Sequence, residues 1–170
     1  MILGVLSDTH SNRVLMHQVA AVMVEELGAE VLFHLGDDYS DAEDLAMAGY
    51  SVRKVPGLWC PEYQNPSIPK RIVEEFDGIT VAAAHAEKDL RHAQHAAGII
   101  LLGHTHRPRI EHIGLSLYVN PGHLRSTTSR GVQPASFAIV EIGPTEVRAA
   151  IHDPSGALRR EVIISRDRLA

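Results

Sequence analysis

The strongest constraint on the fold is a series of short apolar runs that each end abruptly at Gly, Asp, His or Pro. Residues 2–6 and 31–35 are such runs in the first third of the chain, and residues 99–102 are another. Residues 52–55 are predicted as a further strand, which ends at Pro56-Gly57. Continuous runs of this length are typical of strands that are buried on both faces of a parallel sheet. The chain is therefore expected to be built on buried strands, with polar side chains where those strands end.

Helical patterns separate several of these strands. Residues 12–27 place apolar side chains at helical spacing, and Gly28 suits the C-terminal cap of that helix. Further helices are predicted over residues 40–48 and 87–97. Parallel strands need such crossover connections, so the first half of the chain is expected to have an α/β organisation.

Hairpins dominate the rest of the chain. Asp77-Gly78 joins two apolar segments, residues 71–76 and 79–84, in the manner of a tight β-turn. Strand-like segments follow at residues 109–113, 115–120, 136–142, 147–152 and 161–165. We predict one α/β domain over residues 1–170, a four-layer β-sandwich in which two sheets are flanked by helices.

Composition excludes several classes of protein. Lys and Arg number 16 against 21 Asp and Glu, for a formal net charge of -5, which argues against binding to a nucleic-acid backbone. The single cysteine, Cys60, excludes a disulfide framework. No apolar run approaches the roughly 20 residues of a membrane span, so we expect a cytoplasmic protein with no membrane contact.

Ionisable side chains gather at the predicted strand ends. In chain order they are Asp8, His10, Asp37, His85, His104 and His106. Because the carboxyl ends of parallel strands meet at one edge of a sheet, these two carboxylates and four imidazoles are expected to converge. Such a mixed nitrogen and oxygen set suits Zn, Mn, Fe, Ni or Co better than Ca.

Each of these motifs has a simpler explanation when it is taken alone. Asp8-Thr9-His10 is equally consistent with a helix-capping Asp, and Gly36-Asp37 with a turn. Gly103-His104-Thr105-His106 is a stronger signal, because two His two residues apart in a loop can converge on one ion. Their order at successive strand ends is what favours a metal centre.

That order resembles the calcineurin-like metallophosphoesterase superfamily, and within it the small phosphodiesterases and the retromer subunit of similar size. The likeness runs from Met1 to about Gly122, through the segments Asp8-Thr9-His10, His34-Leu35-Gly36-Asp37, Gly103-His104-Thr105-His106-Arg107-Pro108 and Asn120-Pro121-Gly122. The family fold is a β-sandwich flanked by helices, in agreement with the strand pattern above.

The resemblance implies a centre of two divalent metal ions (Mn, Zn, Fe or Ni). One ion would be held by Asp8, His10, Asp37 and His106. The second would be held by Asp37, His85 and His104. It further implies a phosphodiesterase that acts on a small phosphate-ester substrate, in which a hydroxide bridging the ions attacks phosphorus.

The sequence departs from the family pattern at Leu58. The family places an Asn ligand here, whereas this chain reads Gly57-Leu58-Trp59-Cys60-Pro61-Glu62. Leucine cannot coordinate a metal, so either the second ion is held more weakly or Cys60 or Glu62 replaces the missing ligand. Trp59 is either an apolar wall for substrate or a cover for the core.

A second departure is His123, which follows Asn120-Pro121-Gly122 where the family usually has Ser. His123 is a candidate catalytic residue that contacts phosphate or protonates a leaving group, with a surface-loop histidine as the simpler alternative. After His85, the usual His-Gly-His of the family is replaced by His85-Ala86-Glu87.

The remaining histidines have simpler interpretations. His34 lies within a strand and is expected to be buried and hydrogen-bonded beside the metal centre. His92 and His95 are expected on a solvated helix face. Arginines near the motifs are default surface charges that could meet substrate phosphate: Arg107, Arg109 and Arg125.

Two other functions stay open. A catalytically weak scaffold that binds protein partners, as the retromer subunit does, is favoured by the loss of the ligand at Leu58. A mononuclear metal hydrolase would result if only the side with Asp8, His10 and His106 is filled. Exposed sheet edges near the C-terminal hairpins can also pair with a second copy of the chain, so a homo-oligomer is open as well.

Overall fold

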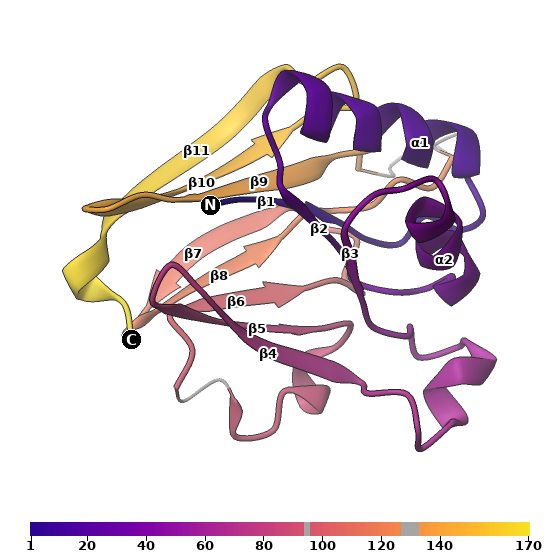
Figure 1. The fold of residues 1–170 in the computed structure, drawn as a ribbon, viewed down its shortest axis with the longest axis horizontal. Coiled ribbons are helices and arrows are strands. Elements are labelled where there is room, and N and C mark those ends of the chain that lie inside the picture. The colour runs from indigo at the N-terminus through magenta and orange to yellow at the C-terminus, as the bar shows by residue number, and fades with distance from the viewer. Residues whose placement is uncertain (94–95, 127–132) are drawn as a thin grey trace.

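Two β-sheets packed face to face form the body of the protein in a computed structural model, which describes residues 1–93, 96–126 and 133–170 (Figure 1). The six-stranded sheet has the order β11-β10-β9-β1-β2-β3, with β1 (Ile2–Leu6), β2 (Val31–His34), β3 (Val52–Lys54), β9 (Phe137–Ile142), β10 (Glu146–His152) and β11 (Leu158–Ser165). The five-stranded sheet has the order β4-β5-β6-β8-β7, with β4 (Arg71–Phe76), β5 (Ile79–Ala84), β6 (Ile99–Leu102), β7 (Arg109–Ile113) and β8 (Ser116–Asn120).

The buried strand β1 shows why the apolar runs do not alternate with polar residues. Leu3 and Val5 face the layer between the two sheets, whereas Leu6 belongs to a second apolar cluster, under the helices. A Cβ on Gly4 would lie 2.6 Å from a methyl carbon of Leu32, so the side chains of the helix-covered face pack closely against the backbone of β1 here. Both faces of β1 are therefore covered, as the continuous run predicts.

Helices cover the outer face of the six-stranded sheet (Figure 1). The α-helix α1 (Arg13–Ala21) continues into a π-helical turn at Val22–Glu26, and α2 (Tyr39–Met47) follows β2. Both helices match the predicted segments closely. The three first strands of this sheet run parallel, β1 with β2 and β2 with β3, so their carboxyl ends share one edge.

The predicted hairpin and C-terminal strands are also present. Asp77 and Gly78 both have positive φ, at 48° and 76°, as a tight turn between β4 and β5 requires. Strands β5 and β6 run parallel, so the five-stranded sheet also places carboxyl ends together. The expected α/β fold of two packed sheets with helices is thus confirmed.

The prediction of a helix over residues 87–97 is wrong for the part of this segment that the structure describes. The described residues there form turns and short 3₁₀ structure such as Glu87–Asp89, and Arg91 has a left-handed backbone with φ 54°, which no α-helix tolerates. Leu90 and Ala97 are held in an apolar cluster with strands β5 and β6, so this segment covers the outer face of the five-stranded sheet without a helix. His95, predicted on that helix, lies outside the described residues.

In the described residues, no helix is both long and apolar enough to cross a membrane.

Candidate metal centre

Four loops meet where strands β1, β2, β5 and β6 end, and backbone hydrogen bonds tie them together. The amide of Asp8 donates to the carbonyl of Gly36 at 3.0 Å. The amide of Gly103 donates to the carbonyl of His85 at 3.1 Å, and the amide of His104 donates to Asp8 Oδ2 at 3.1 Å. All six predicted metal ligands therefore come to one end of the sandwich.

The backbone at this end is unusual, because most candidate ligands are in the left-handed region. The φ angles are 54° at Asp8, 48° at His10, 71° at Asp37, 66° at His104 and 58° at His106. Asp and His tolerate this conformation better than most residues, at a cost of order 1 kcal/mol each. Strain of this kind, concentrated on residues with ligand chemistry, is typical of a functional site.

Glycines let the loops approach each other closely. A Cβ on Gly36, whose φ is 99°, would lie 2.7 Å from the amide nitrogen of Gly57. A Cβ on Gly57 would overlap the backbone N and Cα of Asp37, and one on Gly103 would overlap Ser7 Oγ. The loop that carries Asp37 is therefore packed directly against the loop that begins at Gly57.

Four of the candidate ligands form a cluster suited to one metal ion. One ligand atom from each lies within 4.8 Å of all the others in the set Asp8, His10, Asp37 and His106. His10 Nε2 lies 3.0 Å from Asp37 Oδ2, His106 Nε2 lies 3.0 Å from Asp8 Oδ1, and the two Nε2 atoms are 3.4 Å apart. Ligands about 2.1 Å from a tetrahedral zinc would be about 3.4 Å apart, so these separations match a coordination sphere.

His85 extends the cluster on the other side of Asp37. Its Nδ1 donates to the carbonyl of Leu35 at 2.7 Å, which leaves Nε2 as the nitrogen with a lone pair. This Nε2 is buried without a hydrogen-bond partner and lies 3.3 Å from Asp37 Oδ1. A buried lone pair facing a carboxylate oxygen needs a cation between them, and a carbonyl that fixes the ring tautomer is typical of metal-bound histidine.

His104 lies next to His85. The two ring centroids are 5.1 Å apart, and the His104 side chain is exposed. His104 is thus placed beside His85, whose Nε2 faces Asp37.

The two carboxyl groups differ in their acidity. Burial opposes ionisation of Asp8, but His106 and a hydrogen bond from Ser7 outweigh it, so the pKa of Asp8 lies below its ordinary value. Burial and the nearby charge of Asp8 raise the pKa of Asp37. A divalent cation would relieve the repulsion between the two carboxylates, so the donor set, with its unpartnered atoms, fits a bound metal.

A buried hydrogen-bond network supports the loops that carry the ligands. The amide of Gly36 donates to His34 Nδ1 at 3.3 Å, and His34 Nε2 lies 3.4 Å from Thr9 Oγ1. The hydroxyl of Thr9 donates to Asp41 at 2.6 Å. Burial lowers the pKa of His34 to about 4, so the ring is neutral and links the loops after β1 and β2, as expected for a histidine beside the centre.

The segment around Leu58 lies at the edge of the cluster. The thiol of Cys60 donates to the backbone carbonyl of Asp37, and burial raises the pKa of that thiol. Neither Cys60 nor Glu62 belongs to the ligand cluster found among the described residues. The side chain of Trp59 is 89% exposed, so its interpretation as a cover for the core is wrong.

His123 is buried beside the cluster. Its Nε2 donates to the carbonyl of Gln133 at 2.8 Å, its Nδ1 has no partner, and its ring centroid lies 5.5 Å from that of His106. The surface-loop alternative is therefore wrong. Burial lowers the pKa of His123, and with its N–H directed to Gln133 the ring has no proton to give a leaving group, so this geometry does not support that role.

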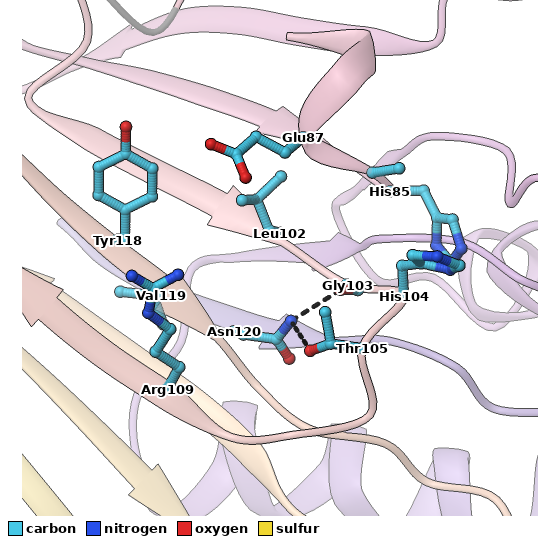
Figure 2. A pocket seen from close by; sticks show the side chains of 11 residues that line it. His85, Glu87, Leu102, Gly103, His104, Thr105, Arg109, Tyr118, Val119 and Asn120 are labelled. Carbon is cyan, nitrogen blue, oxygen red and sulfur yellow. Dashed lines mark hydrogen bonds between the residues drawn. The ribbon is translucent and has the colours of Figure 1, made fainter.

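Three supporting groups were missed by sequence reasoning. Ser7 donates to Asp8 Oδ2, and Thr9 bridges His34 and Asp41. Asn120 Nδ2 donates to the carbonyl of Gly103 at 2.7 Å and to Thr105 Oγ1 at 3.1 Å, which fixes the loop between His104 and His106 (Figure 2). Thr9 and Asn120 were part of recognised motifs but had no role assigned to them, whereas nothing in the local pattern marks Ser7.

Comparison with known proteins agrees with this geometry. The family model for the calcineurin-like phosphoesterase superfamily domain matches residues 1–144. Among the curated proteins, none matches the chain.

Solved structures with the same fold include proteins of different roles. A conserved uncharacterised protein of Streptococcus pneumoniae, described as a predicted phosphoesterase, is 22% identical with a TM-score of 0.70 and 97% coverage of both chains. An archaeal phosphodiesterase is 17% identical with a TM-score of 0.67, covering 96% of this chain and 100% of its own. Zinc-complexed Vps29 of Entamoeba histolytica is 15% identical with a TM-score of 0.68, covering 98% and 99%. At these identities the likeness shows the fold alone.

Proposed function

Since the chain belongs to the calcineurin-like phosphoesterase superfamily, we propose that it is a metal-dependent phosphodiesterase. The observation that carries this proposal is the ligand cluster of Asp8, His10, Asp37 and His106, with the unpartnered Nε2 of His85 directed at Asp37. Superfamily members typically bind divalent metals, and this donor set has the composition and spacing that such an ion needs.

The roles of the residues follow from their positions. Asp8, His10 and His106 would hold one ion, His85 and His104 a second, and Asp37 would serve both, since Oδ2 lies near His10 and Oδ1 near His85. Divalent ions supply Lewis acidity toward phosphoryl oxygens and lower the pKa of water.

Proton delivery to the leaving group is not assigned to any residue, because His123 is buried and its N–H is directed to Gln133. We therefore expect esters with good leaving groups to react fastest.

Metal counting combined with hydrolysis tests the proposal. After loading with Mn²⁺ or Zn²⁺ and removal of free metal, we expect two ions per chain by elemental analysis, together with turnover of bis(4-nitrophenyl) phosphate. A protein that retains no metal and shows no turnover would contradict the proposal.

A mononuclear hydrolase is the second candidate, and Leu58 is the observation that favours it. The four-residue cluster is complete, whereas the side with His85 and His104 lacks the amide ligand that the family places at this position. One ion per chain with turnover intact would identify this case. Metal binding without turnover would instead favour a protein-binding scaffold.

Replacing Leu58 by Asn is expected to strengthen the second metal position. Restoring an amide oxygen beside Asp37 should lower the dissociation constant of the second Zn²⁺ by about ten-fold, a typical effect of one supporting group in a metal site. Isothermal titration calorimetry of the metal-stripped protein measures this constant. Leu58→Ala is the matched control, because it removes the leucine without adding a ligand. Equal second constants for Leu58→Asn and Leu58→Ala would show that the position does not face the ion.

A further inference from the structure

Two pockets begin at different members of the candidate ligand set. The Trp59 pocket, of about 430 Å³, is bounded by His10 and Asp37 and, further out, by Tyr39, Trp59, Pro61 and Glu62. The Tyr118 pocket, of about 250 Å³, is bounded by His85 and His104 at one end and by Leu102, Arg109, Tyr118 and Val119 beyond (Figure 2). Each pocket therefore begins at candidate metal ligands and leads away from them.

The sizes of the pockets limit what can occupy them. Ligand pockets usually measure about 300–1,000 Å³, so both of these lie at or below the lower part of that range. Each has room for at least one ring or a short chain. A phosphate ester at the metal ligands could therefore place one substituent in each pocket.

Trp59 indicates the chemistry of the larger pocket. Its side chain is 89% exposed, an unusual state for the largest apolar side chain, and it stands at the edge of a pocket that reaches His10 and Asp37. An exposed indole of this kind offers a flat surface on which a planar ring can stack.

Charge limits the occupant of the Trp59 pocket further. Asp38 and Glu62 line it beyond the candidate ligand Asp37, and no Lys or Arg is among its described lining residues. Lys54 lies over the far ring of Tyr39 but is paired with Glu43 at 3.2 Å. The pocket therefore repels additional anionic groups and accepts a neutral or cationic substituent.

The Tyr118 pocket is nearly neutral by comparison. Arg109 lies over the ring of Tyr118 at 5.8 Å, and its guanidinium is already paired with Glu111. Leu102 and Val119 supply apolar walls, and Glu87 stands at the rim (Figure 2). Arg109 is the only Lys or Arg among the described residues that line this pocket, and Glu111 offsets its charge. This pocket therefore also attracts a second phosphate only weakly.

We propose that the site acts on a phosphodiester whose two substituents carry no negative charge, one in each pocket, with a planar ring stacked on Trp59. This inference rests on the proposed phosphodiesterase activity, which it narrows to diesters with two uncharged substituents, one of them a planar ring. A monoester would leave one pocket without a substituent, and a nucleoside polyphosphate would bring anionic groups to the acidic Trp59 pocket or the nearly neutral Tyr118 pocket.

Binding can be measured apart from turnover, because Trp59 is the only tryptophan of the chain. The intrinsic fluorescence of the Zn²⁺-loaded protein is titrated with diphenyl phosphate, phenyl phosphate and dimethyl phosphate. We expect a saturable change with diphenyl phosphate at a dissociation constant at least ten-fold below that for dimethyl phosphate, with phenyl phosphate between them. Equal affinities for the three esters, or no saturable change, would overturn the inference even if the protein hydrolyses phosphodiesters.

Kinetics provide the second measurement. Trp59→Ala is expected to raise KM for bis(4-nitrophenyl) phosphate about ten-fold with kcat little changed, and Trp59→Phe should recover most of that loss. Leu115→Ala is the control, since Leu115 is 62% exposed and lies at the opposite end of β8 from Asn120. A KM for Trp59→Ala equal to that of wild type, or a higher kcat/KM for 4-nitrophenyl phosphate than for the diester, would reject the two-pocket arrangement.

Discussion

Replacing Asp37 by Asn is expected to lower kcat/KM for an aryl phosphodiester by on the order of 10³-fold, because this carboxylate faces both halves of the candidate metal centre. Its two oxygens lie 3.0 Å from His10 Nε2 and 3.3 Å from His85 Nε2. Asn keeps the shape of the side chain but removes the charge that would hold the ions. Metal per chain, measured after loading, should fall along with turnover.

The stability of the metal-free protein separates this effect from misfolding. Burial and the charge of Asp8 already raise the pKa of Asp37, so removing its charge relieves repulsion in the absence of metal. The melting temperature of stripped Asp37→Asn should be no lower than that of stripped wild type, while the rise on adding Zn²⁺ should be lost. Asp44→Asn is the matched control, because Asp44 pairs with His17 away from the cluster. Wild-type metal content in Asp37→Asn would show that Asp37 is not a ligand.

Gly57→Ala is expected to damage both the fold and the metal centre, although Gly57 has no ligand chemistry. The added Cβ would overlap the backbone of Asp37, which cannot move aside as the end of a flexible side chain could. Overpacking against backbone in a tight region costs about 1–3 kcal/mol, occasionally more. We expect a loss of about 3 kcal/mol in the free energy of unfolding, measured with urea, and a second Zn²⁺ constant weakened by at least ten-fold.

Gly49→Ala is the control for this substitution. Gly49 has a φ of 97°, but nothing lies within 4 Å of a Cβ placed there. Gly49→Ala should therefore lower the free energy of unfolding by about 1 kcal/mol, because alanine is strained in the left-handed backbone, and metal binding should be unchanged. If Gly57→Ala binds metal as tightly as Gly49→Ala, the contact between the two loops does not position Asp37.

The strands and the convergence of the six candidate ligands could be predicted because both depend on simple patterns. Continuous apolar runs such as residues 2–6 indicate burial on both faces, and parallel strands must bring their carboxyl ends to one edge. Asp8 and Asp37 therefore had to lie near each other once β1 and β2 were paired.

The features that could not be predicted from the sequence depend on tertiary packing. The helical spacing over residues 87–97 was overridden by the burial of Leu90 against the five-stranded sheet and by the left-handed Arg91. His123 was turned inward by its bond to Gln133, and Trp59 was left exposed. Side-chain direction in a loop depends on neighbours far along the chain, so no local pattern reports it.

The place of β1 in its sheet has a consequence for the order in which the protein assembles during synthesis. β1 lies between β2 and β9, and the amide of Ile142 donates to the carbonyl of Met1 at 2.9 Å. β1 thus keeps one edge unpaired during synthesis until Phe137–Ile142 has been made. Pairings so distant in sequence fold slowly, and an open edge can join another chain. The open edge of β1 is consequently a site for aggregation of the nascent chain until β9 emerges.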